Sequence, residues 1–475
     1  MSLKFGTSGL RGLVKEMDDE SCYLYTTAFL CYLKERNLLK EKISVGSDLR
    51  QSSDMICESV VKAIIDFGLK IDYLGKVSTP TLSYYSYKRG IASIMITGSH
   101  IPDDRNGIKF NMNYGEVLKN DEEKILEFFD MVKSNSSLSL RFDKKKLKNR
   151  IIIDKFKINE EARGEYIERY IKFFPKNCLD RREIVVYKHS SVARDILVKI
   201  LRKLGGNVIE EGHSDKFIPV DTEAVRAEDI KLAKGYISKY KPDVIFSTDG
   251  DGDRPLMFDE NGDVIKGDIL GIMASLYLNA EHVSLPVSCN TSLEKFKFKV
   301  SKTKIGSPYV IESMNNALKE HEKIIGYEAN GGYLLGSDFI VEGRKIEKLP
   351  TRDSVLVLIC ALLYCYDQNK KISEVVEEIA HKHVYSDSLK GIEPERGRKI
   401  TNIIKDNIEE HFEFIKGKLL EINELDGLRL IFDNGEIVHL RQSGNSPELR
   451  CYSEADTKER AEEINKIVFE IVKKM

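Results

Sequence analysis

The sequence predicts an α/β protein of four domains: three built on related mixed α/β sheets, followed by a C-terminal α+β domain. Its 475 residues are too many for a single hydrophobic core. Between residues 43 and 97, short apolar segments alternate with helical periodicity, which is typical of a mainly parallel sheet covered by helices. The same order recurs at 183–246 and 256–366. No sequence repeat of fixed period accompanies it, so the relatedness of the three units is inferred from the order of their elements.

The first unit begins with a helix that two aspartates at 18–19 can cap and that runs to about residue 37. Apolar residues then recur on one face between 52 and 67, and Gly68 is a good stop for this second helix. Strands are expected around these helices, at 43–46, 69–74 and 91–97. A polar, basic and serine-rich stretch at 133–150 marks the first domain boundary.

The remaining elements follow from the same periodicities and turn residues. The second unit is expected to have strands at 183–187, 207–210 and 243–246, and helices at 159–173, 192–204 and 227–240. The third is expected to have strands at 256–258, 283–287 and 324–325, and helices at 268–278, 309–321 and 351–366. The last has helical patterns at 373–382, 398–413 and 456–474, and a hairpin at 428–440 with an Asp-Asn-Gly turn. We therefore expect domains at 1–145, 146–248, 249–368 and 369–475.

Composition argues against several classes of partner. Lys plus Arg number 74 and Asp plus Glu 76, a formal charge of −2 that gives no reason to expect a nucleic-acid or membrane partner. Trp is absent, so base-stacking surfaces are not indicated. The eight cysteines include no CxxC pair and are expected to be reduced thiols of a cytoplasmic protein. No secretory leader is visible, and the longest apolar run, 355–365, is too short to span a bilayer.

The most specific local signal is the DGDGDR segment at 249–254. Carboxylates at Asp249, Asp251 and Asp253, separated by glycines, can turn onto one small hard cation. An EF-hand calcium loop is a rival, but it requires glycine at the sixth position, where this chain has Arg254, and a helix rather than a strand before it. In preference to a solvated acidic turn, we expect a Mg²⁺ site that leaves room for a ligand phosphate, with Arg254 facing the same anion.

A second candidate site follows the expected strand at 91–97. Ser99 lies in a TGSHIP turn at the carboxyl end of that strand, the edge at which open α/β sheets bind ligands. The basic residues His100, Arg105 and Lys109 nearby suit an anionic substrate. Taken alone, the segment is equally consistent with an ordinary polar loop.

Three further loops give weaker signals. The glycine-rich opening segment FGTSGLRG presents Arg11 from a loop. In GYEANGGY, at 326–333, Glu328 and Asn330 can hydrogen-bond sugar hydroxyls, although such loops are more often plain turns. RQSGNSPELR, at 441–450, lies between two expected strands and has the donors of a phosphate cradle, with a plain hairpin loop as the alternative. Its candidate ligands are Arg441, Ser443, Gly444, Asn445, Ser446 and Arg450.

In these loops, the chain resembles the α-D-phosphohexomutase family of bacterial phosphomannomutases and phosphoglucomutases. The resemblance covers essentially the whole length, and the loops come in the family order. Residues 97–100 match the phosphoserine loop, with Gly98 where alanine is commoner. Residues 106–109 match the segment of the family's acid/base lysine. The other matches are the opening loop with Arg11, the metal loop at 249–254, the sugar loop with Glu328 and Asn330, and the phosphate loop at 441–446.

The resemblance implies a mechanism and four domains around a central cleft. Ser99 would be phosphorylated and would share Mg²⁺ with the three aspartates. Arg11, Arg254 and Lys109 would stabilise the transferring phosphoryl group, with hexose 1,6-bisphosphate as intermediate and activator. Lys109, with a pKa lowered among other cations, would exchange the hydroxyl proton. His100 would orient the serine or that proton.

The resemblance also bears on the substrate and on the assembly. It implies a small-molecule sugar phosphate as the substrate, and a protein that is a monomer or a homodimer. The sugar loop at 326–333 looks most like that of bacterial phosphomannomutases, so mannose is the first choice and glucose the second. Two departures from the family matter for the sugar. The chain has Ser-Cys-Asn at 288–290 where family members often carry a lysine, and Ser307 where they often carry a histidine. The alternatives are a phosphoglucosamine mutase, a non-catalytic sugar-phosphate-binding protein, and a hydrolase that passes the phosphoryl group to water. A nucleotide kinase is disfavoured because no GxxxxGK[ST] loop is present.

Overall fold

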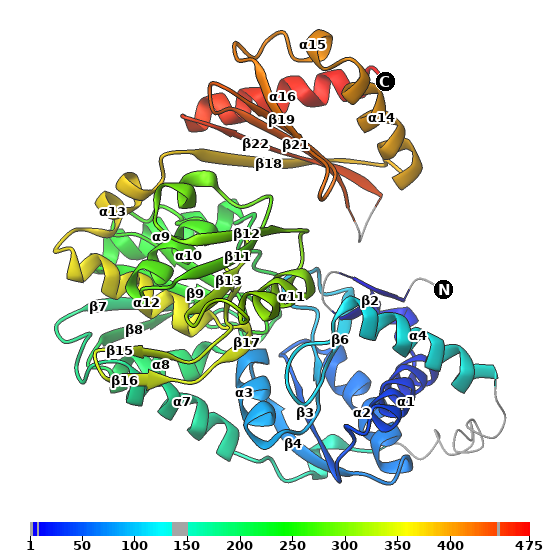
Figure 1. Cartoon of the computed structure of the whole chain (residues 1–475). Helices are drawn as coiled ribbons and strands as arrows, with labels where there is room; N and C mark the ends of the chain where they lie inside the picture. The colour runs from blue at the N-terminus through cyan, green and yellow to red at the C-terminus, as the bar shows by residue number, and fades with distance from the viewer. Residues whose placement is uncertain (1–2, 7–8, 135–150, 444–446) are drawn as a thin grey trace.

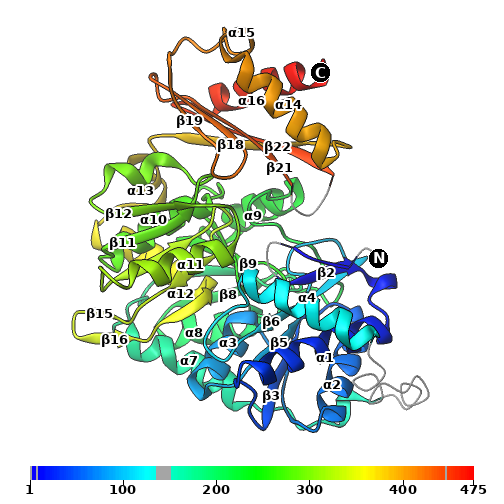
Figure 2. The same ribbon diagram turned by 45° about the vertical axis from the view of Figure 1, so that its right-hand side comes forward.

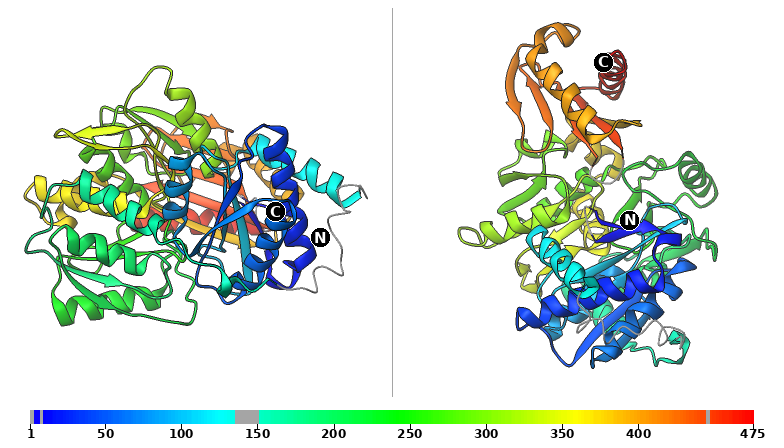
Figure 3. Two further views of the ribbon diagram at one scale, coloured as in Figure 1. Left: turned by 90° about the horizontal axis from the view of Figure 1, so that it is seen from below. Right: turned by 90° about the vertical axis from the view of Figure 1, so that its right-hand side faces the viewer.

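The computed structural model describes residues 3–6, 9–134, 151–443 and 447–475. Three α/β domains lie against one another, and a C-terminal domain stands beside the third (Figure 1). The same grouping is visible after a rotation of 45° (Figure 2) and in two further views (Figure 3). The predicted class, three mixed α/β domains followed by an α+β domain, is confirmed.

The first domain is a six-stranded sheet in which three parallel strands form one side and antiparallel strands form the other. The strands are β1 (Lys4–Phe5), β2 (Leu10–Leu13), β3 (Lys42–Ser47), β4 (Lys70–Lys76), β5 (Ser93–Ile96) and β6 (Arg105–Asn111). The helices are α1 (Asp19–Glu35), α2 (Ser52–Asp66), α3 (Thr79–Arg89) and α4 (Lys119–Ser134), with the 3₁₀ turn η1 (Val14–Glu16). The strand order is β1-β2-β6-β5-β3-β4, and β3 pairs in parallel with β4 and β5. As predicted, Asp18 caps α1 by accepting a hydrogen bond from the Ser21 amide at 2.7 Å.

The second domain is a four-stranded sheet in the order β10-β9-β7-β8. Its elements are α7 (Glu161–Phe173), β7 (Glu183–Tyr187), α8 (Arg194–Lys203), β8 (Asn207–Glu211), α9 (Ala227–Tyr240), β9 (Val244–Thr248) and β10 (Pro255–Phe258). The 3₁₀ turn η2 (Ile153–Lys155), which precedes them, packs on the core of the first domain. The expectation that residues 256–258 begin the third unit is wrong. Because the DGDGDR turn reverses the chain, β10 pairs antiparallel with β9, with Pro255 opposite Thr248.

The third domain has a five-stranded sheet in the order β12-β11-β13-β14-β17 and a separate β15–β16 hairpin. The strands are β11 (His282–Pro286), β12 (Lys299–Thr303), β13 (Ile324–Tyr327), β14 (Tyr333–Leu335), β15 (Phe339–Val341), β16 (Arg344–Ile346) and β17 (Leu349–Arg352). The helices are α10 (Gly267–Tyr277), η3 (Thr291–Lys295), α11 (Ser307–Ala317), α12 (Ser354–Asp367) and α13 (Ile372–Ile379). One hydrophobic core runs through the second and third domains and includes Phe246, Leu270 and Leu358.

The C-terminal domain is an antiparallel sheet, in the order β18-β22-β21-β20-β19, with its own hydrophobic core. Its elements are β18 (His383–Lys390), α14 (Pro394–Asp406), α15 (Ile408–His411), β19 (Leu419–Asn423), β20 (Leu428–Phe432), β21 (Ile437–Gln442), β22 (Glu448–Ala455) and α16 (Lys458–Lys473). The expected single helix at 398–413 is wrong, because Asn407 leaves helical geometry at φ −136° and ψ 45°. Among the helices of the described residues, none has both the length and the apolar character needed to span a bilayer.

Candidate active site

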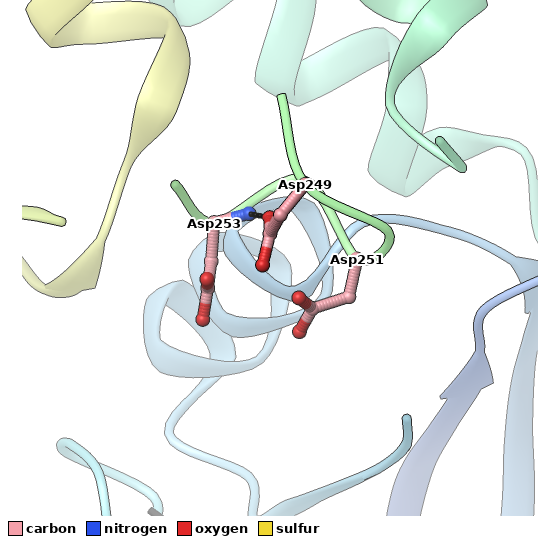
Figure 4. Close-up of side chains that lie close together, drawn as sticks. All are labelled: Asp249, Asp251 and Asp253. Carbon is pink, nitrogen blue, oxygen red and sulfur yellow. Dashed lines mark hydrogen bonds between the residues drawn. The ribbon is translucent and has the colours of Figure 1, made fainter. Parts of the chain in front are cut away.

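The three aspartates of the DGDGDR turn converge at the end of β9. Asp249, Asp251 and Asp253 are fully buried, and each offers an oxygen within 4.8 Å of the others (Figure 4). Asp251 Oδ1 and Asp253 Oδ1 have no hydrogen-bond partner among the described residues. Buried carboxylate oxygens without donors are unfavourable unless a cation compensates them, and Mg²⁺ prefers oxygen ligands of this kind. The cluster therefore fits a divalent cation.

The titration of the aspartates supports the same assignment. Burial and the neighbouring carboxylates of Asp251 and Asp253 raise the pKa of Asp249 well above its usual range. Burial also acts to raise the pKa of Asp251, but Lys109 outweighs it and the pKa is lowered. The carboxylates of the cluster therefore repel one another at Asp249, and a bound cation would relieve that repulsion.

The backbone of this turn is held by all three α/β domains. The carbonyls of residues 250–252 each accept one hydrogen bond from a different domain. The donors are Thr79 N of the first domain at 3.0 Å, Val192 N of the second at 3.0 Å and Ser354 Oγ of the third at 2.7 Å. The aspartate cluster therefore lies where the three domains meet.

Ser99 lies beside the aspartate cluster. Its Oγ donates to Asp249 Oδ2 at 2.5 Å and lies 3.2 Å from His100 Nδ1. Its φ of 55° is in the left-handed region, and its amide donates to Thr97 Oγ1 at 2.8 Å. Such a conformation costs a side-chain-bearing residue on the order of 1–3 kcal/mol and is concentrated at functional sites. The turn after β5 thus holds the serine hydroxyl against the aspartates.

Arg50, which sequence reasoning missed, holds the Ser99 loop in place. Its guanidinium, fully buried, donates hydrogen bonds of 2.5–3.1 Å to the carbonyls of Ser99, Ile101, Pro102 and Arg105. Arg50 Nε lies 3.3 Å from Asp48 Oδ2, which also accepts from Thr97 Oγ1 at 2.8 Å. The guanidinium lies 3.9 Å from the ring centre of Phe217, in the second domain. The sequence feature that could have indicated Arg50 is an Asp-x-Arg triplet at 48–50, shortly after the expected strand at 43–46.

Lys109, on β6, connects the first domain to the aspartate cluster. Its Nζ donates to Asp251 Oδ2 at 2.7 Å and to Asp253 Oδ2 at 2.6 Å. Burial acts to lower its pKa, but the two carboxylates outweigh burial and raise the pKa above its usual value. The expected lowering of the Lys109 pKa is therefore wrong. In this arrangement Lys109 is a charged ammonium, which can donate a proton or stabilise negative charge.

Three arginines from different domains surround the same cluster: Arg11 on β2, Arg254 at the end of the DGDGDR turn, and Arg352 on β17. Burial lowers the pKa of Arg11 to about 10, and the charges of Arg254 and Arg352 contribute to this. Burial and the same arginines hold the pKa of His100 well below its usual range, so the imidazole beside Ser99 is neutral near pH 7. The structure therefore brings together the sequence-predicted residues Ser99, His100, Lys109, Arg11 and Arg254.

Glu328 and Asn330 lie in the buried turn between β13 and β14. Glu328 Oε2 accepts a hydrogen bond from Arg352 Nη1 at 3.2 Å. Asn330 Oδ1 accepts from a backbone amide of the same turn at 2.9 Å, and its carbonyl accepts from Thr222 Oγ1 of the second domain at 2.8 Å. Arg352 also lies 3.2 Å from Asp253 Oδ2, so this turn is linked to the aspartate cluster. Sequence reasoning missed Arg352.

The expected phosphate loop connects β21 and β22 of the C-terminal domain. Arg441 and Arg450 lie opposite each other in the strand register. Arg441 Nε donates to Asp426 Oδ2 at 2.8 Å, and Arg450 Nη2 donates to Glu448 Oε1 at 2.8 Å. The Ser443 amide donates to the Glu448 carbonyl at 3.0 Å. The other predicted ligands lie outside the described residues: Gly444, Asn445 and Ser446.

Two carboxylates relate this loop to the other domains. Asp426 Oδ2, which holds Arg441, also accepts from Ile305 N of the third domain at 2.8 Å. Glu223, of the second domain, has its pKa raised by burial, while the charges of Arg254 and Arg450 act in the opposite direction. The charges of Arg254, of the second domain, and of Arg450, on β22, therefore both act on this one carboxylate.

A buried aspartate cluster, a serine hydroxyl held against it and cations from three domains are groups that suit phosphoryl transfer. The chain matches four family models described as Phosphoglucomutase/phosphomannomutase. They are alpha/beta/alpha domain I over residues 2–136, domain II over 165–262, domain III over 266–383 and the C-terminal domain over 393–471. The chain belongs to this family, the α-D-phosphohexomutases, and is a mutase that acts on sugar phosphates.

Curated relatives agree along the whole chain. The chain is 39% identical over 476 residues to a phosphomannomutase of Salmonella muenchen, covering 99% of this chain and 96% of the relative. It is 39% identical over 471 residues to a phosphomannomutase of Sinorhizobium fredii, covering 98% and 97%. A crystal structure of a phosphoglucomutase/phosphomannomutase family protein from Burkholderia thailandensis has a TM-score of 0.73 at 17% identity, over 98% of this chain and 97% of that one. This last likeness concerns the fold.

Proposed function

We propose that the protein is a phosphomannomutase that interconverts mannose 6-phosphate and mannose 1-phosphate, with glucose phosphates as a second substrate pair. The observation that carries the proposal is the hydrogen bond from Ser99 Oγ to Asp249 Oδ2 inside a buried, cation-binding cluster. The two relatives at 39% identity are phosphomannomutases, which supports mannose over glucose.

Ser99 is proposed to carry a phosphoryl group on Oγ and to pass it to a free hydroxyl of the bound hexose phosphate. The hexose oxygen bonds to phosphorus as the bond from phosphorus to Oγ breaks, which gives hexose 1,6-bisphosphate. Transfer of the other phosphoryl group back to Oγ completes the isomerisation. Mg²⁺, held by the three aspartates, would neutralise charge on the transferring group. Arg11 and Arg254 would hydrogen-bond its oxygens, because this chemistry depends mainly on positioning and electrostatic stabilisation.

Proton balance requires the attacking hydroxyl to lose a proton and Ser99 Oγ to gain one. Lys109 is charged between two carboxylates and is suited to donate the proton to the departing Oγ. The neutral His100, with Nδ1 3.2 Å from Ser99 Oγ, is suited to accept the proton from the hexose hydroxyl. A weak base suffices because the transition state of phosphoryl transfer is loose.

The rest of the substrate would be bound by the two remaining loops. Glu328 and Asn330 would hold sugar hydroxyls that occupy similar places in both orientations of the bisphosphate. The phosphate that does not react would bind Arg441, Ser443, Gly444, Asn445, Ser446 and Arg450, because arginines and backbone amides suit phosphate oxygens. Two orientations in one site favour a C-terminal domain that opens and closes between the transfers.

We further propose a cytoplasmic enzyme that works as a monomer or homodimer. All eight cysteines of the chain are free thiols in the structure, as a reducing compartment would favour.

The pairing of β10 with β9 leads us to place the boundary between the second and third domains after Phe258.

The first test is the mass of the peptide that contains Ser99, followed by turnover assays with Mg²⁺ and a trace of hexose 1,6-bisphosphate. We expect partial phosphorylation of Ser99 and faster isomerisation of mannose 1-phosphate than of glucose 1-phosphate or glucosamine 1-phosphate. Preference for glucosamine 1-phosphate would indicate a phosphoglucosamine mutase. Release of free phosphate would indicate a hydrolase. A Ser99 that the bisphosphate cannot phosphorylate would indicate a non-catalytic sugar-phosphate-binding protein.

A further inference from the structure

Arg352 joins two turns on which the proposed reaction depends, and it belongs to neither of them. It is the last residue of β17 and is 3% exposed. Its Nε lies 3.2 Å from Asp253 Oδ2, and its Nη1 donates to Glu328 Oε2 at 3.2 Å. One side chain of the third domain therefore contacts both a cation-binding carboxylate and the carboxylate expected to face the sugar.

The backbone that carries Arg352 is anchored on both sides. Thr351 Oγ1 donates to Glu116 Oε1 of the first domain at 2.7 Å. The carboxylate of Asp353 accepts hydrogen bonds of 2.6–2.8 Å from two tyrosine hydroxyls of α7. Because its neighbours are fixed in this way, Arg352 is a stable reference point to which the two carboxylates are held.

Gly332 provides the space through which the Arg352 side chain passes. A Cβ added at Gly332 would lie 2.3 Å from Arg352 Cδ and 2.7 Å from Arg352 Cγ, closer than side-chain carbons can approach. Gly332 is not among the glycines with positive φ, so the need here is for space and not for backbone conformation. Its carbonyl accepts from Glu328 N at 3.0 Å, so the same glycine is part of the turn that Arg352 holds.

The charges around Asp253 give the contact a consequence for the cation. Asp253 Oδ2 accepts from Lys109 Nζ at 2.6 Å and lies against Arg352, so two cations share one oxygen. Asp253 Oδ1 is buried without a hydrogen-bond partner within the described part of the chain. Occupation of Oδ2 by both side chains leaves Oδ1 as the oxygen for a bound cation.

We propose that Arg352 is a positioning residue that fixes the Asp253 carboxylate toward the cation and the Glu328 carboxylate toward the sugar, and that Gly332 is required because of Arg352. The proposal rests on the proposed mutase function. It predicts that changes at 332 and 352 act through one arrangement, so their effects on catalysis do not add.

The test compares Arg352→Met, Arg352→Lys, Gly332→Ala and the double variant Gly332→Ala/Arg352→Met. We expect kcat/KM for mannose 1-phosphate to fall about 100-fold in Arg352→Met and about tenfold in Gly332→Ala, because misplaced reacting groups are costly. Arg352→Lys keeps the charge but cannot span both carboxylates, and should fall between wild type and Arg352→Met. The double variant should be no worse than Arg352→Met. Gly235→Ala is the matched control, because nothing lies within 4 Å of a Cβ there.

A second readout separates positioning from general damage. The electron paramagnetic resonance spectrum of bound Mn²⁺, which reports the geometry of its ligands, should change in Arg352→Met and not in Gly235→Ala, because Asp253 Oδ1 is no longer held toward the cation. A Mn²⁺ spectrum in Arg352→Met that matches the wild type would overturn the proposal. So would near-normal turnover of Arg352→Met, or losses that multiply in the double variant. A wild-type protein that isomerises no hexose phosphate would instead refute the proposed function on which the role depends.

Discussion

Replacing Arg50 by methionine should release the loop that carries Ser99. The guanidinium donates to four carbonyls between residues 99 and 105, and no other described side chain donates to those carbonyls. Methionine preserves much of the buried volume but has no donor, so the loop loses its attachment while the surrounding core stays filled.

The structure gives the magnitude of this effect. Four hydrogen bonds at a net value of about 1 kcal/mol each amount to about 4 kcal/mol. Breaking the buried pair of Arg50 with Asp48 independently suggests a cost of about 3–5 kcal/mol. A change of about 4 kcal/mol in the free energy of loop opening corresponds to a roughly 1,000-fold larger open population.

Amide hydrogen exchange of the peptide that covers residues 97–106 measures this opening directly. We expect protection of that peptide to fall far more than protection of α2, and phosphorylation of Ser99 by hexose 1,6-bisphosphate to slow accordingly. The control is Arg105→Met, which removes an exposed arginine from the same loop and leaves the Arg50 contacts intact. Unchanged protection of residues 97–106 in Arg50→Met would refute the reasoning.

Three further changes test other parts of the molecule. Ser99→Ala should abolish turnover, assayed by ³¹P NMR, while calorimetry still detects sugar-phosphate binding, because only the phosphoryl carrier is lost. Asp426→Ala should raise KM about tenfold with little change in kcat, since it releases Arg441 from the carboxylate that orients it. Burial lowers the pKa of His189 from 6.5 to about 4, so the unfolded chain binds a proton that the folded chain does not. The free energy of unfolding should therefore be independent of His189 titration above pH 6.5 and should fall as the pH decreases toward 4, by about 2 kcal/mol at pH 5. Hydrogen exchange of β7 and β9 should show this fall.

Matched variants exist for these measurements. Near-normal turnover of Ser99→Ala would exclude the phosphoserine. Glu424→Ala, which breaks an exposed pair with Lys405 near Asp426, should leave KM unchanged; an effect of Asp426→Ala on kcat alone would contradict the orienting role. His213→Gln removes an exposed histidine and should keep the loss of protection at low pH. Protection of β7 and β9 that is the same at pH 7.5 and pH 5 would show that His189 is not held neutral.

The sequence by itself determined the parts of the site that lie within a few residues of one another. The spacing of Asp249, Asp251 and Asp253 is enough to predict a cation site, because glycines between them allow one tight turn to gather all three carboxylates. In the same way, the apolar segment that ends before Ser99 predicts a strand followed by a ligand-facing turn. The alternation of strands and helices predicts the three α/β domains, because hydrophobic periodicity is a local property.

Only the tertiary structure decided which distant residues complete the site. Arg50 is about 50 residues away from the loop it holds, and Arg352 is about 100 residues away from Asp253, and no local pattern records such contacts. The raised pKa of Lys109 likewise depends on carboxylates more than 140 residues away, which a sequence pattern does not place beside the amine. Strand β18 was missed because its polar residues become a strand only through pairing with β22, more than 50 residues later. Local propensity specifies turns and elements, whereas charge pairing and sheet edges depend on how the domains pack.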